Sequence, residues 1–261
     1  MKRTPVSLDQ KDIPTAFQPF FRDATVYDSS CSAEARVWFL DKESGFYLKK
    51  SPKGTLAKEA AMTDFFHNKG LGAEVLGYES GKFDWLLTRR VPGEDCTWKL
   101  YLDDPKRLCD TTAQLLRKLH ETAGEGCPVQ DRTADYIGGT KRNFEAGIFS
   151  NEFLPERWKH ISPKEAWNIA QQAIKSMKTD TLLHGDYCLP NIMLDNWQFS
   201  GFIDLDGAGV GDRHIDLFWG VWTLQFNLKT DRYGERFLDA YGRDVIDMDM
   251  LSAIPFFEAF G

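Results

Sequence analysis

Four runs of β-branched, aromatic and other apolar residues in the first third of the chain predict short strands. They lie at residues 35–40, 45–50, 74–78 and 84–88. The polar segment 41–44 separates the first two runs, which predicts a hairpin. Residues 55–68 are rich in Ala, Lys, Glu and Met, which favours a helix that ends at Gly70. The part of the chain before Pro92 is therefore expected to form a β-rich domain with one helix.

The remainder of the chain has the apolar spacing of helices. Asp104 is expected to cap a helix that runs from Pro105 to about residue 122. Ser162 and Glu165 have the spacing of a capping box, and residues 216–228 predict a buried helix. Because Pro92 and Gly93 interrupt the pattern, we expect an N-terminal domain at 1–91 and a C-terminal domain at 92–261, with a hinge at about 89–93.

One segment of the C-terminal part is dense with small, polar and acidic residues between apolar runs. A strand at 181–183 leads into the loop His184-Gly185-Asp186. Two apolar runs, 192–194 and 199–203, then predict a hairpin, with Asn191 just before it and Asp204 just after it. Because an antiparallel hairpin brings its two ends together, we expect Asn191 and Asp204 to be neighbours.

Carboxylate and amide oxygens from these loops suit Mg²⁺, which takes few protein ligands and completes its shell with water and substrate phosphates. Asp186 has no basic neighbour in sequence, so its carboxylate can accept a proton or orient a hydroxyl. A lone His-Gly-Asp triplet could be an ordinary turn. The full spacing, His-Gly-Asp-x4-Asn followed by a hairpin and Ile-Asp, is far more specific.

Composition narrows the class of protein further. The 261 residues are 42% hydrophobic and 27% charged, which is typical of a globular fold and excludes disordered, collagenous and disulfide-scaffold proteins. The net charge of −7 argues against nucleic-acid binding and permits a cationic substrate. No apolar run is long enough for a transmembrane helix, and no signal-peptide pattern is present. Five scattered cysteines favour a reducing, cytoplasmic location.

The segment from His184 to Asp204 resembles the aminoglycoside phosphotransferase family, most closely the aminoglycoside 3′-phosphotransferases (kanamycin kinases). The resemblance is strong over His184-Gly-Asp-Tyr-Cys-Leu-Pro-Asn-Ile-Met193 and Phe199-Ser-Gly-Phe-Ile-Asp204, and weaker over most of the rest. It implies an α+β, bilobal protein-kinase-like fold, with an antiparallel sheet and one helix in the first lobe and a mostly helical second lobe.

The resemblance also assigns roles to this segment. Asp186 would orient or deprotonate the acceptor hydroxyl, and Asn191 and Asp204 would hold Mg²⁺ against the phosphates of ATP or GTP. His184 would shape the loop through hydrogen bonds. Asp216 matches a position that supports the catalytic loop, and as a partly buried acid it would need partners.

The first lobe would supply a lysine for the nucleotide phosphates. The resemblance points to Lys49, with Glu59 in the following helix as its ion-pair partner. Lys50 is adjacent, but strand alternation puts Tyr47 and Lys49 on one face and Lys50 on the other. An aromatic beside the lysine favours Lys49, and Tyr47 would lie against the adenine or, alternatively, pack as an ordinary strand residue.

Other nucleotide contacts are weaker predictions. No glycine-rich loop precedes the lysine strand, and the polar loop 28–32 would contact the phosphates instead, through its backbone and through Ser29, Ser30 and Ser32. Arg89 and Val91 would belong to a hinge whose backbone binds the purine, although the arginine could equally be a rim charge. Ile203 would line the nucleotide site.

A protein kinase is a poorer match. Gly185 stands where those enzymes have an arginine that couples to a phosphorylated loop. Only eleven residues separate Asp204 from Asp216, which leaves no room for a peptide-binding activation segment.

The acceptor side departs from the aminoglycoside-modifying relatives. The arginine that follows their metal-binding aspartate is missing, because Leu205-Asp-Gly-Ala208 stands there, and the end of the chain keeps only one of two acids, Glu258. Asp206, Glu258 and Glu156 are the candidate acids for a cationic acceptor. Trp219 and Trp222 are either core residues or an aromatic wall for a cation or sugar ring.

Several functions remain open at this point. The leading one is an ATP- or GTP-dependent kinase for a hydroxyl of a small cationic sugar, with the 3′-hydroxyl of an aminoglycoside first among acceptors and antibiotic resistance as the outcome. A kinase for another amino sugar or a choline-like alcohol is the alternative, and a non-catalytic nucleotide-binding module or an interaction protein is a third class. We expect a monomer or weak dimer, with no nucleic-acid or membrane partner.

Overall fold

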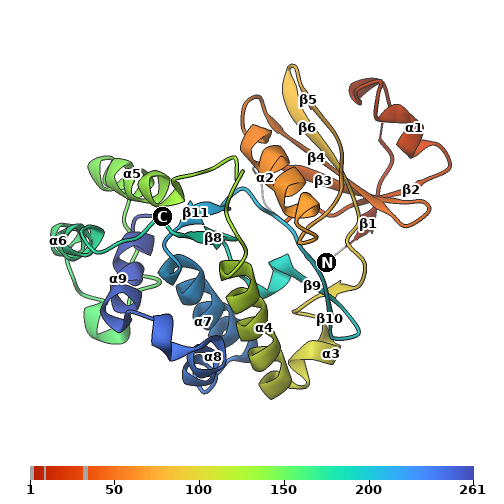
Figure 1. Cartoon of the computed structure of the whole chain (residues 1–261). Helices are drawn as coiled ribbons and strands as arrows, with labels where there is room; N and C mark the ends of the chain where they lie inside the picture. The colour runs from red at the N-terminus through yellow and green to blue at the C-terminus, as the bar shows by residue number, and fades with distance from the viewer. Residues whose placement is uncertain (1–2, 9, 32–34) are drawn as a thin grey trace. The chain divides into compact units, whose positions relative to one another are not determined.

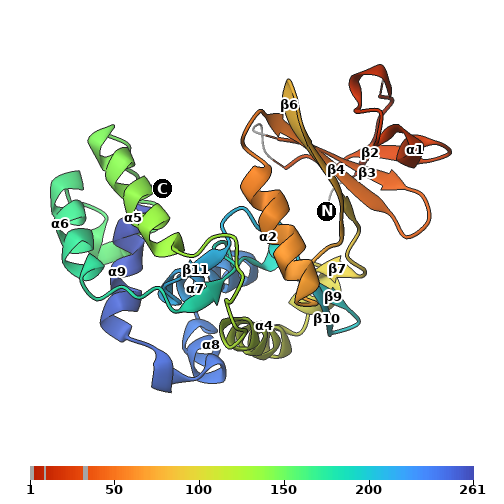
Figure 2. The ribbon, with the colours of Figure 1, turned by 45° about the horizontal axis from the view of Figure 1, so that its top comes forward.

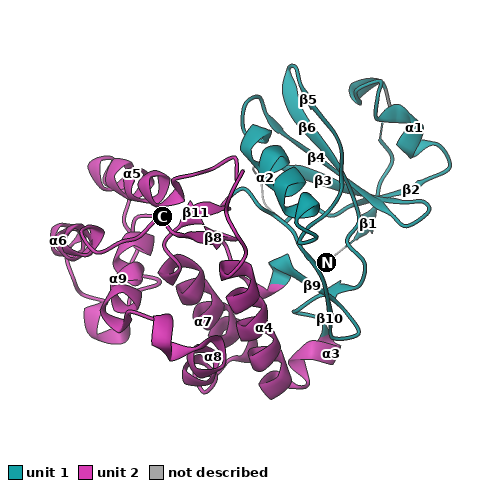
Figure 3. Ribbon diagram, in the orientation of Figure 1, with its two compact units in different colours: residues 1–98, 190–206 teal, residues 99–189, 207–261 magenta. Residues whose placement is uncertain are grey.

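The computed structural model describes residues 3–8, 10–31 and 35–261 of the chain. The chain divides into two compact units, residues 1–98 with 190–206 (unit 1) and residues 99–189 with 207–261 (unit 2), as Figure 3 shows. The hairpin segment 190–206 therefore groups with the β-rich part of the chain, although it lies in the range expected for the second domain. The expected domain boundary at residue 91 stays a prediction.

Unit 1 contains a six-stranded antiparallel sheet with the strand order β1-β2-β3-β4-β6-β5 (Figure 1). Its strands are β1 (Thr4–Pro5), β2 (Thr25–Asp28), β3 (Arg36–Asp41), β4 (Phe46–Pro52), β5 (Val75–Ser80) and β6 (Phe83–Arg89). Strands β3 and β4 pair as the predicted hairpin, and β5 pairs with β6 around the turn at residues 81–82.

The other elements of unit 1 surround this sheet or form a second, smaller one. They are η1 (Gln10–Asp12), α1 (Gln18–Phe21), α2 (Ala57–Asn68), β7 (Glu94–Asp95), β9 (Ile192–Asp195) and β10 (Gln198–Phe202). Strands β9 and β10 form the hairpin predicted from the sequence, and β7 joins them in the order β10-β9-β7.

Strand alternation divides the side chains of the large sheet between two faces. On one face, Trp85 and Leu87 of β6 belong to a core cluster with Phe21 of α1. On the other, Leu86 packs with Ala60 of α2, and Figure 2 shows this helix lying along the sheet. The second face thus positions α2, the helix that carries Glu59.

Unit 2 is mostly helical, as expected. Its elements are α3 (Lys99–Leu102), α4 (Pro105–His120), α5 (Arg132–Glu145), η2 (Glu156–Trp158), α6 (Pro163–Ile174), β8 (Thr181–Leu183), β11 (Gly209–Gly211), α7 (His214–Leu228), α8 (Gly234–Tyr241), η4 (Arg243–Val245) and α9 (Met248–Glu258). The short helix η3 (Leu189–Asn191) spans the division between the units. Within the described ranges, no helix is both long and apolar enough to cross a bilayer.

The predicted helix starts follow from their capping residues. The Asp104 carboxylate accepts a hydrogen bond from the backbone N–H of Arg107 at 3.2 Å, which caps α4. Ser162 and Glu165 form the full capping box of α6. The helix expected at 216–228 begins two residues earlier, at His214. Sequence analysis did not find α5, α8 or α9.

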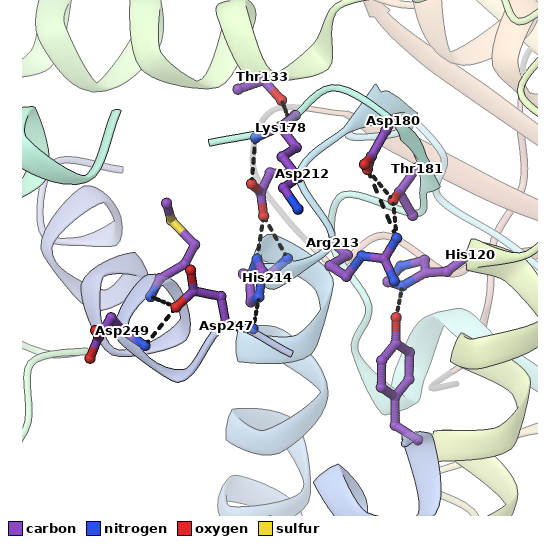
Figure 4. Close-up of polar contacts among 12 residues, drawn as sticks. His120, Thr133, Lys178, Asp180, Thr181, Asp212, Arg213, His214, Asp247 and Asp249 are labelled. Atoms are coloured by element: carbon purple, nitrogen blue, oxygen red, sulfur yellow. Dashed lines mark hydrogen bonds and ion pairs between the residues drawn. The ribbon is translucent and has the colours of Figure 1, made fainter. Parts of the chain in front are cut away.

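A buried polar network fixes the start of α7 in unit 2 (Figure 4). The carboxylate of Asp212 accepts hydrogen bonds from the backbone N–H groups of Lys178, at 2.7 Å, and of His214, at 3.0 Å. Nδ1 of His214 lies 2.6 Å from the same carboxylate, while its Nε2 accepts the backbone N–H of Asp247 at 2.9 Å. The imidazole of His214 therefore carries its proton on Nδ1 and links α7 to the start of α9.

Candidate active site

A lysine and two carboxylates of unit 1 form a charge cluster, here called the Lys49 cluster: Lys49, Glu59 and Asp204. The Lys49 ammonium on β4 lies 2.7 Å from Oε2 of Glu59 on α2 and 3.1 Å from Oδ1 of Asp204, which follows β10. The side chain of Glu59 is 8% exposed, whereas that of Asp204 is 54% exposed. The Lys49 cluster thus joins the large sheet, α2 and the β9–β10 hairpin.

Strand register explains why Lys49, and not Lys50, makes these contacts. Lys49 is directly opposite Leu86 on the neighbouring strand, and Leu86 packs on the α2 face of the sheet. Lys50 points to the opposite face, where its ammonium lies 4.1 Å from the ring centre of Phe83 and 4.8 Å from that of Trp85. The ion pair with Glu59 expected from the sequence is therefore present.

Burial and charge act in opposite directions in the Lys49 cluster. Burial disfavours the charged ammonium, but the carboxylates of Asp204 and Glu59 outweigh it and raise the pKa of Lys49. Burial raises the pKa of Glu59, the Asp204 charge adds to this, and Lys49 opposes both. Lys49 therefore stays protonated at neutral pH and can contact an anion.

The two predicted metal ligands lie at the ends of the β9–β10 hairpin. The backbone N–H of Ile203 donates to the carbonyl oxygen of Asn191 at 3.1 Å, which closes the hairpin directly before Asp204. Asn191 is 8% exposed. Asp204 has a left-handed backbone conformation with φ of 60°. This conformation is uncommon for a residue other than glycine, and it typically costs about 1–3 kcal/mol of folding free energy. The hairpin and Lys49 hold this strained residue in place.

The oxygen donors of Asn191 and Asp204 have the chemistry that Mg²⁺ prefers. In the described part of the chain, no group of three or more His, Cys, Asp or Glu side chains could hold a metal ion. Two protein oxygens beside a lysine fit an ion that completes its shell with water and phosphate oxygens, which is the usual arrangement for Mg²⁺.

The polar loop before β3 is organised by its own hydrogen bonds. Oδ1 of Asp28 accepts the backbone N–H of Ser30 at 2.8 Å, and the Ser30 hydroxyl accepts the backbone N–H of Val37 at 3.0 Å. The bond from Ser30 is the main cause that lowers the pKa of Asp28. Ser29 is buried, and its N–H donates to the carbonyl of Val37. Ser32, the third predicted serine, lies outside the described residues.

A cavity of about 180 Å³ in unit 1 contains one of the predicted nucleotide-binding residues, Tyr47. The residues that line it are Arg3, Tyr47, Arg90, Gly93, Glu94, Asp95, Trp98 and Met193. The guanidinium of Arg3 donates to the Tyr47 hydroxyl at 3.1 Å and lies 3.7 Å from the ring centre of Phe39. Sequence reasoning missed Arg3, because no motif surrounds it.

The remaining predicted nucleotide residues contribute differently. Val91 is buried in a small cluster with Met193, and Ile203 packs against it. Arg89 lies at the surface, where its Nε donates to Oε2 of Glu74 at 2.7 Å. The arginine therefore has a structural partner, as expected for a rim charge.

Unit 2 carries the His184-Gly185-Asp186 loop, and Asp216 of α7 stabilises this loop through hydrogen bonds. The fully buried carboxylate of Asp216 accepts the backbone N–H groups of His184 and Gly185, each at 2.7 Å. Asp186 is half-buried, and its N–H donates to Nδ1 of the buried His184 at 3.3 Å. Asp216 thus contacts the loop from α7, and the His184 side chain makes a hydrogen bond within the loop.

A histidine that sequence analysis did not single out extends this support. Nε2 of His120, at the end of α4, lies 3.2 Å from Oδ2 of Asp216, and Nδ1 lies 2.8 Å from the Tyr241 hydroxyl. Burial lowers the pKa of His120, and Asp216 partly opposes this. The neutral imidazole thus bridges Tyr241 and the carboxylate beneath the loop.

Two glycines meet behind this loop. A side chain on Gly185, whose φ is +83°, would collide with the carbonyl of Gly207 at 1.8 Å, so only glycine fits there. Nε of Arg132 on α5 donates to the Gly207 carbonyl at 2.7 Å. The contact joins residues far apart in sequence, so no local pattern indicates it.

The three candidate acceptor acids have different surroundings. Asp206 lies 3.6 Å from the Lys58 ammonium in unit 1, with its side chain 57% exposed. Glu258 of α9 is buried in unit 2, where Oε1 accepts the Tyr136 hydroxyl at 2.6 Å. Glu156 begins η2 and is exposed.

Glu258 is the most perturbed of these acids. Burial raises its pKa to about 7, the charge of Asp186 adds to the effect, and Tyr136, Arg132 and a hydrogen bond from Trp219 oppose it. Glu258 thus titrates near neutral pH and lies in the same neighbourhood of unit 2 as Asp186.

Comparison with known proteins identifies the class of molecule that this fold and these residues define. The chain matches the sequence model of the phosphotransferase enzyme family over residues 30–253. The protein therefore belongs to the phosphotransferase enzyme family.

Individual relatives agree with this assignment. A probable aminoglycoside 3′-phosphotransferase of Lactococcus lactis subsp. lactis (strain IL1403) is 48% identical over 95% of this chain and 95% of that protein. An aminoglycoside 3′-phosphotransferase of Streptomyces fradiae is 27% identical over 82% of this chain and 85% of its own length.

Solved structures agree on the fold. A crystal structure of an aminoglycoside-3′-phosphotransferase of type VIII matches with a TM-score of 0.74 at 22% identity, over 95% of this chain and 100% of that one. The aminoglycoside phosphotransferase APH(3'')-Id from Streptomyces rimosus, in complex with ADP and streptomycin, matches with a TM-score of 0.76 at 22% identity, over 97% and 99%. The predicted α+β, protein-kinase-like fold is confirmed.

Proposed function

We propose that this phosphotransferase moves the γ-phosphate of ATP or GTP to a hydroxyl of a small cationic sugar, with the 3′-hydroxyl of an aminoglycoside as the first acceptor to test. The observation that carries the proposal is the Lys49 cluster, in which a protonated lysine is held between a buried glutamate and an exposed aspartate. The 48% identity to the Lactococcus relative supports the choice of acceptor.

Phosphoryl transfer asks a protein mainly to position the reactants and to neutralise charge. Lys49 would contact the nucleotide phosphates while Glu59 fixes its direction. The half-buried Asp186 would orient the acceptor hydroxyl and accept its proton as the new oxygen–phosphorus bond forms and the bond to the leaving nucleoside diphosphate breaks. Asp216 and His184 would keep the Asp186 loop in one conformation through the bonds described above.

Asn191 and Asp204 would hold Mg²⁺. When bound, such an ion neutralises negative charge on the transferred phosphate. The strained backbone of Asp204 and its contact with Lys49 would aim the carboxylate at the ion. The number of ions, one or two, stays open.

The base of the nucleotide would lie beside Tyr47, in the cavity that Arg90 and Met193 also line. Ser29 and Ser30 would contact the phosphates, and Val91 and Ile203 would flank the base. Because a hinge reads a purine mostly through its backbone, the residues do not distinguish ATP from GTP.

The alternative acceptors are another amino sugar and a choline-like alcohol. Both are cationic alcohols, and the buried acid Glu258 suits an ammonium group in either case. A nucleotide-binding module without catalysis would leave the buried support of the Asp186 loop without a use. The five free cysteines agree with the reducing, cytoplasmic location expected from the sequence, which stays a prediction.

A coupled nucleotide-turnover assay with Mg²⁺ tests the proposal. ATP and GTP are each combined with kanamycin, neomycin or choline, and Asp186→Ala serves as the control. Turnover that requires an aminoglycoside and is lost in Asp186→Ala is expected. Turnover with choline alone would favour the alternative, and nucleotide binding without transfer to any acceptor would contradict the proposal.

A further inference from the structure

Five aromatic side chains of unit 2 form a continuous surface, here called the aromatic wall: Phe153, Phe218, Trp219, Trp222 and Phe226. Four of them lie on α7. Trp219, Trp222 and Phe226 follow one another at spacings of three and four residues, which places them on one side of the helix, and Phe218 directly precedes Trp219. Phe153 comes from the segment between α5 and α6. Its ring lies 6.3, 5.2 and 5.6 Å from the rings of Phe218, Trp219 and Trp222.

The contacts within the aromatic wall are mutual and ordered. The rings of Trp219 and Trp222 meet edge to face at 5.3 Å, and those of Trp222 and Phe226 stack at 4.9 Å. Such edge-to-face and stacked pairs stabilise one another beyond the area they bury. Each ring of the aromatic wall is therefore supported by its neighbours.

The aromatic wall is only partly covered. Phe153, Phe218, Trp219 and Trp222 are half-buried, and Phe226 is 53% exposed. The neighbouring residues Leu217, Thr223 and Leu224 of the same helix are buried. Phe218 and Trp219 also pack against a core cluster of unit 2. The accessible part of the aromatic wall therefore increases towards Phe226, and contiguous exposed apolar surface commonly marks a binding site.

The aromatic wall is connected to the groups proposed for catalysis. Asp216, three residues before Trp219 on α7, accepts the backbone N–H of Gly185 at 2.7 Å, and the hydroxyl of Thr223, next to Trp222, accepts the backbone N–H of Leu189 at 3.0 Å. The same helix therefore carries the aromatic wall and contacts the chain on both sides of Asp186. Trp219 and Asp186 also both affect the pKa of the buried Glu258. An acceptor whose hydroxyl reaches Asp186 would contact these rings.

One cation already occupies the outer end of this surface. The Lys229 ammonium lies 4.2 Å from the ring centre of Phe226. In this contact a ring of the aromatic wall already binds an ammonium group through its face. An ammonium group on a sugar would bind a ring face in the same way.

We propose that the aromatic wall is the acceptor-binding surface, on which an amino-sugar ring stacks with its ammonium group directed towards Glu258. This inference rests on the proposed function. Trp222 and Phe226 then determine specificity, because they select acceptors with a flat ring face, and Glu258 provides the charged contact. Recognition by stacking depends less on ionic strength than recognition by exposed acids would.

Steady-state kinetics with kanamycin and MgATP test the role of the aromatic wall. Trp222→Ala is expected to raise KM for kanamycin roughly 10-fold, with kcat and KM for ATP changed less than about twofold. Trp222→Phe restores most of the loss. Ile148→Ala, which removes an exposed apolar side chain elsewhere in unit 2, is the matched control and leaves all constants unchanged.

Phe226→Ala is a second variant that should keep the fold intact, because the Phe226 side chain is 53% exposed. It is expected to raise KM for kanamycin about threefold. Unchanged KM values for kanamycin in both Trp222→Ala and Phe226→Ala would overturn the inference while leaving the proposed function intact. Absence of kanamycin phosphorylation by the unmodified protein would instead contradict the proposed function.

Discussion

The Lys49 cluster of unit 1 and the aromatic wall of unit 2 are built in opposite ways. The first is a set of paired charges, in which Lys49 contacts Glu59 at 2.7 Å and Asp204 at 3.1 Å. The second is a set of rings, one of which, Trp219, contributes a hydrogen bond to the buried acid Glu258. Under the proposed function, charge neutralisation, which every phosphoryl transfer requires, and acceptor recognition, which varies, would be handled by separate parts of the chain.

The largest expected effect belongs to the group proposed to act on the acceptor. Asp186→Asn should lower kcat by about 10²- to 10⁴-fold, because the amide cannot accept the proton of the acceptor hydroxyl. Initial rates at saturating kanamycin and MgATP measure this. Asp103→Asn, which changes an exposed acid on the same unit, is the control. Equal rates for Asp186→Asn and the unmodified protein would remove Asp186 from the mechanism.

Two adjacent lysines test the charged half of the comparison. Lys49→Met should lower kcat/KM for ATP on the order of 10- to 100-fold, because the variant lacks the half-buried ammonium proposed to contact the phosphates. Lys50→Met, on the opposite face of β4, should change kcat/KM for ATP by less than about threefold. The kcat/KM ratio of the two variants is the measurement, and similar losses in both would contradict the assignment of Lys49.

A buried carboxylate of unit 1, Asp84, binds the backbone N–H groups just before α2 and gives a prediction for how stability depends on pH. Asp84 is fully buried, and burial alone would raise its pKa. Its carboxylate instead has a pKa lowered to about 2, because it accepts hydrogen bonds from Ser80, from the N–H groups of Leu56 and Gly54, and from Tyr78.

Since the pKa of Asp84 is depressed on folding, its contribution is fully present above the ordinary value of 3.8 and is lost as the pH falls through about 2. The free energy of unfolding should decline by up to ~2 kcal/mol over this range. Denaturant unfolding at pH 7, 4 and 2.5 measures it. Asp84→Asn should be less stable at pH 7 and should lose this part of the pH dependence. An unchanged slope would contradict the account.

The smallest predicted effect concerns the acid of the acceptor side. Glu258 has a pKa raised to about 7, so it gains its negative charge as the pH rises through neutrality. KM for kanamycin should therefore fall a few-fold between pH 6 and pH 8. In Glu258→Gln, KM for kanamycin should change less between pH 6 and pH 8. Comparison of the two proteins also corrects for titration of the amines of kanamycin, which is the same in both. An equal pH response in the variant would exclude Glu258 from acceptor binding.

The raised pKa of Glu258 also affects stability: a rise in pH should improve kanamycin binding but lower the free energy of unfolding. The neutral form of Glu258 is the one favoured by folding, so its contribution is complete below pH 4.5 and is lost as the pH rises through about 7. The unmodified protein should lose free energy of unfolding over this interval relative to Glu258→Gln.

The parts of the molecule that local sequence encodes were predictable. Strand alternation places Lys49 and Lys50 on opposite faces, hairpin pairing places Asn191 and Asp204 at neighbouring strand ends, and capping residues mark the starts of α4 and α6. In each case, residues that act together are close in sequence or share one strand.

The remainder depends on contacts between distant residues. His120 meets Asp216 across 96 positions, and Tyr136 meets Glu258 across 122. No periodicity encodes such pairs. Asp206 could not be distinguished from other surface acids, and its ion pair with Lys58 appears only when α2 lies beside the segment after Asp204. The residues proposed for the acceptor side, such as Glu258, are brought together by contacts between distant parts of the sequence, so they were the least predictable.

Analysis of the reaction product tests the central claim most directly. The protein is incubated with MgATP and kanamycin, and mass spectrometry follows the sugar while chromatography follows the nucleotide. We expect kanamycin with one added phosphoryl group and an equal amount of ADP, both formed at least about 100-fold more slowly by Asp186→Asn. ATP binding without any phosphorylated kanamycin, or phosphorylated kanamycin formed at the same rate by Asp186→Asn, would contradict the proposed function.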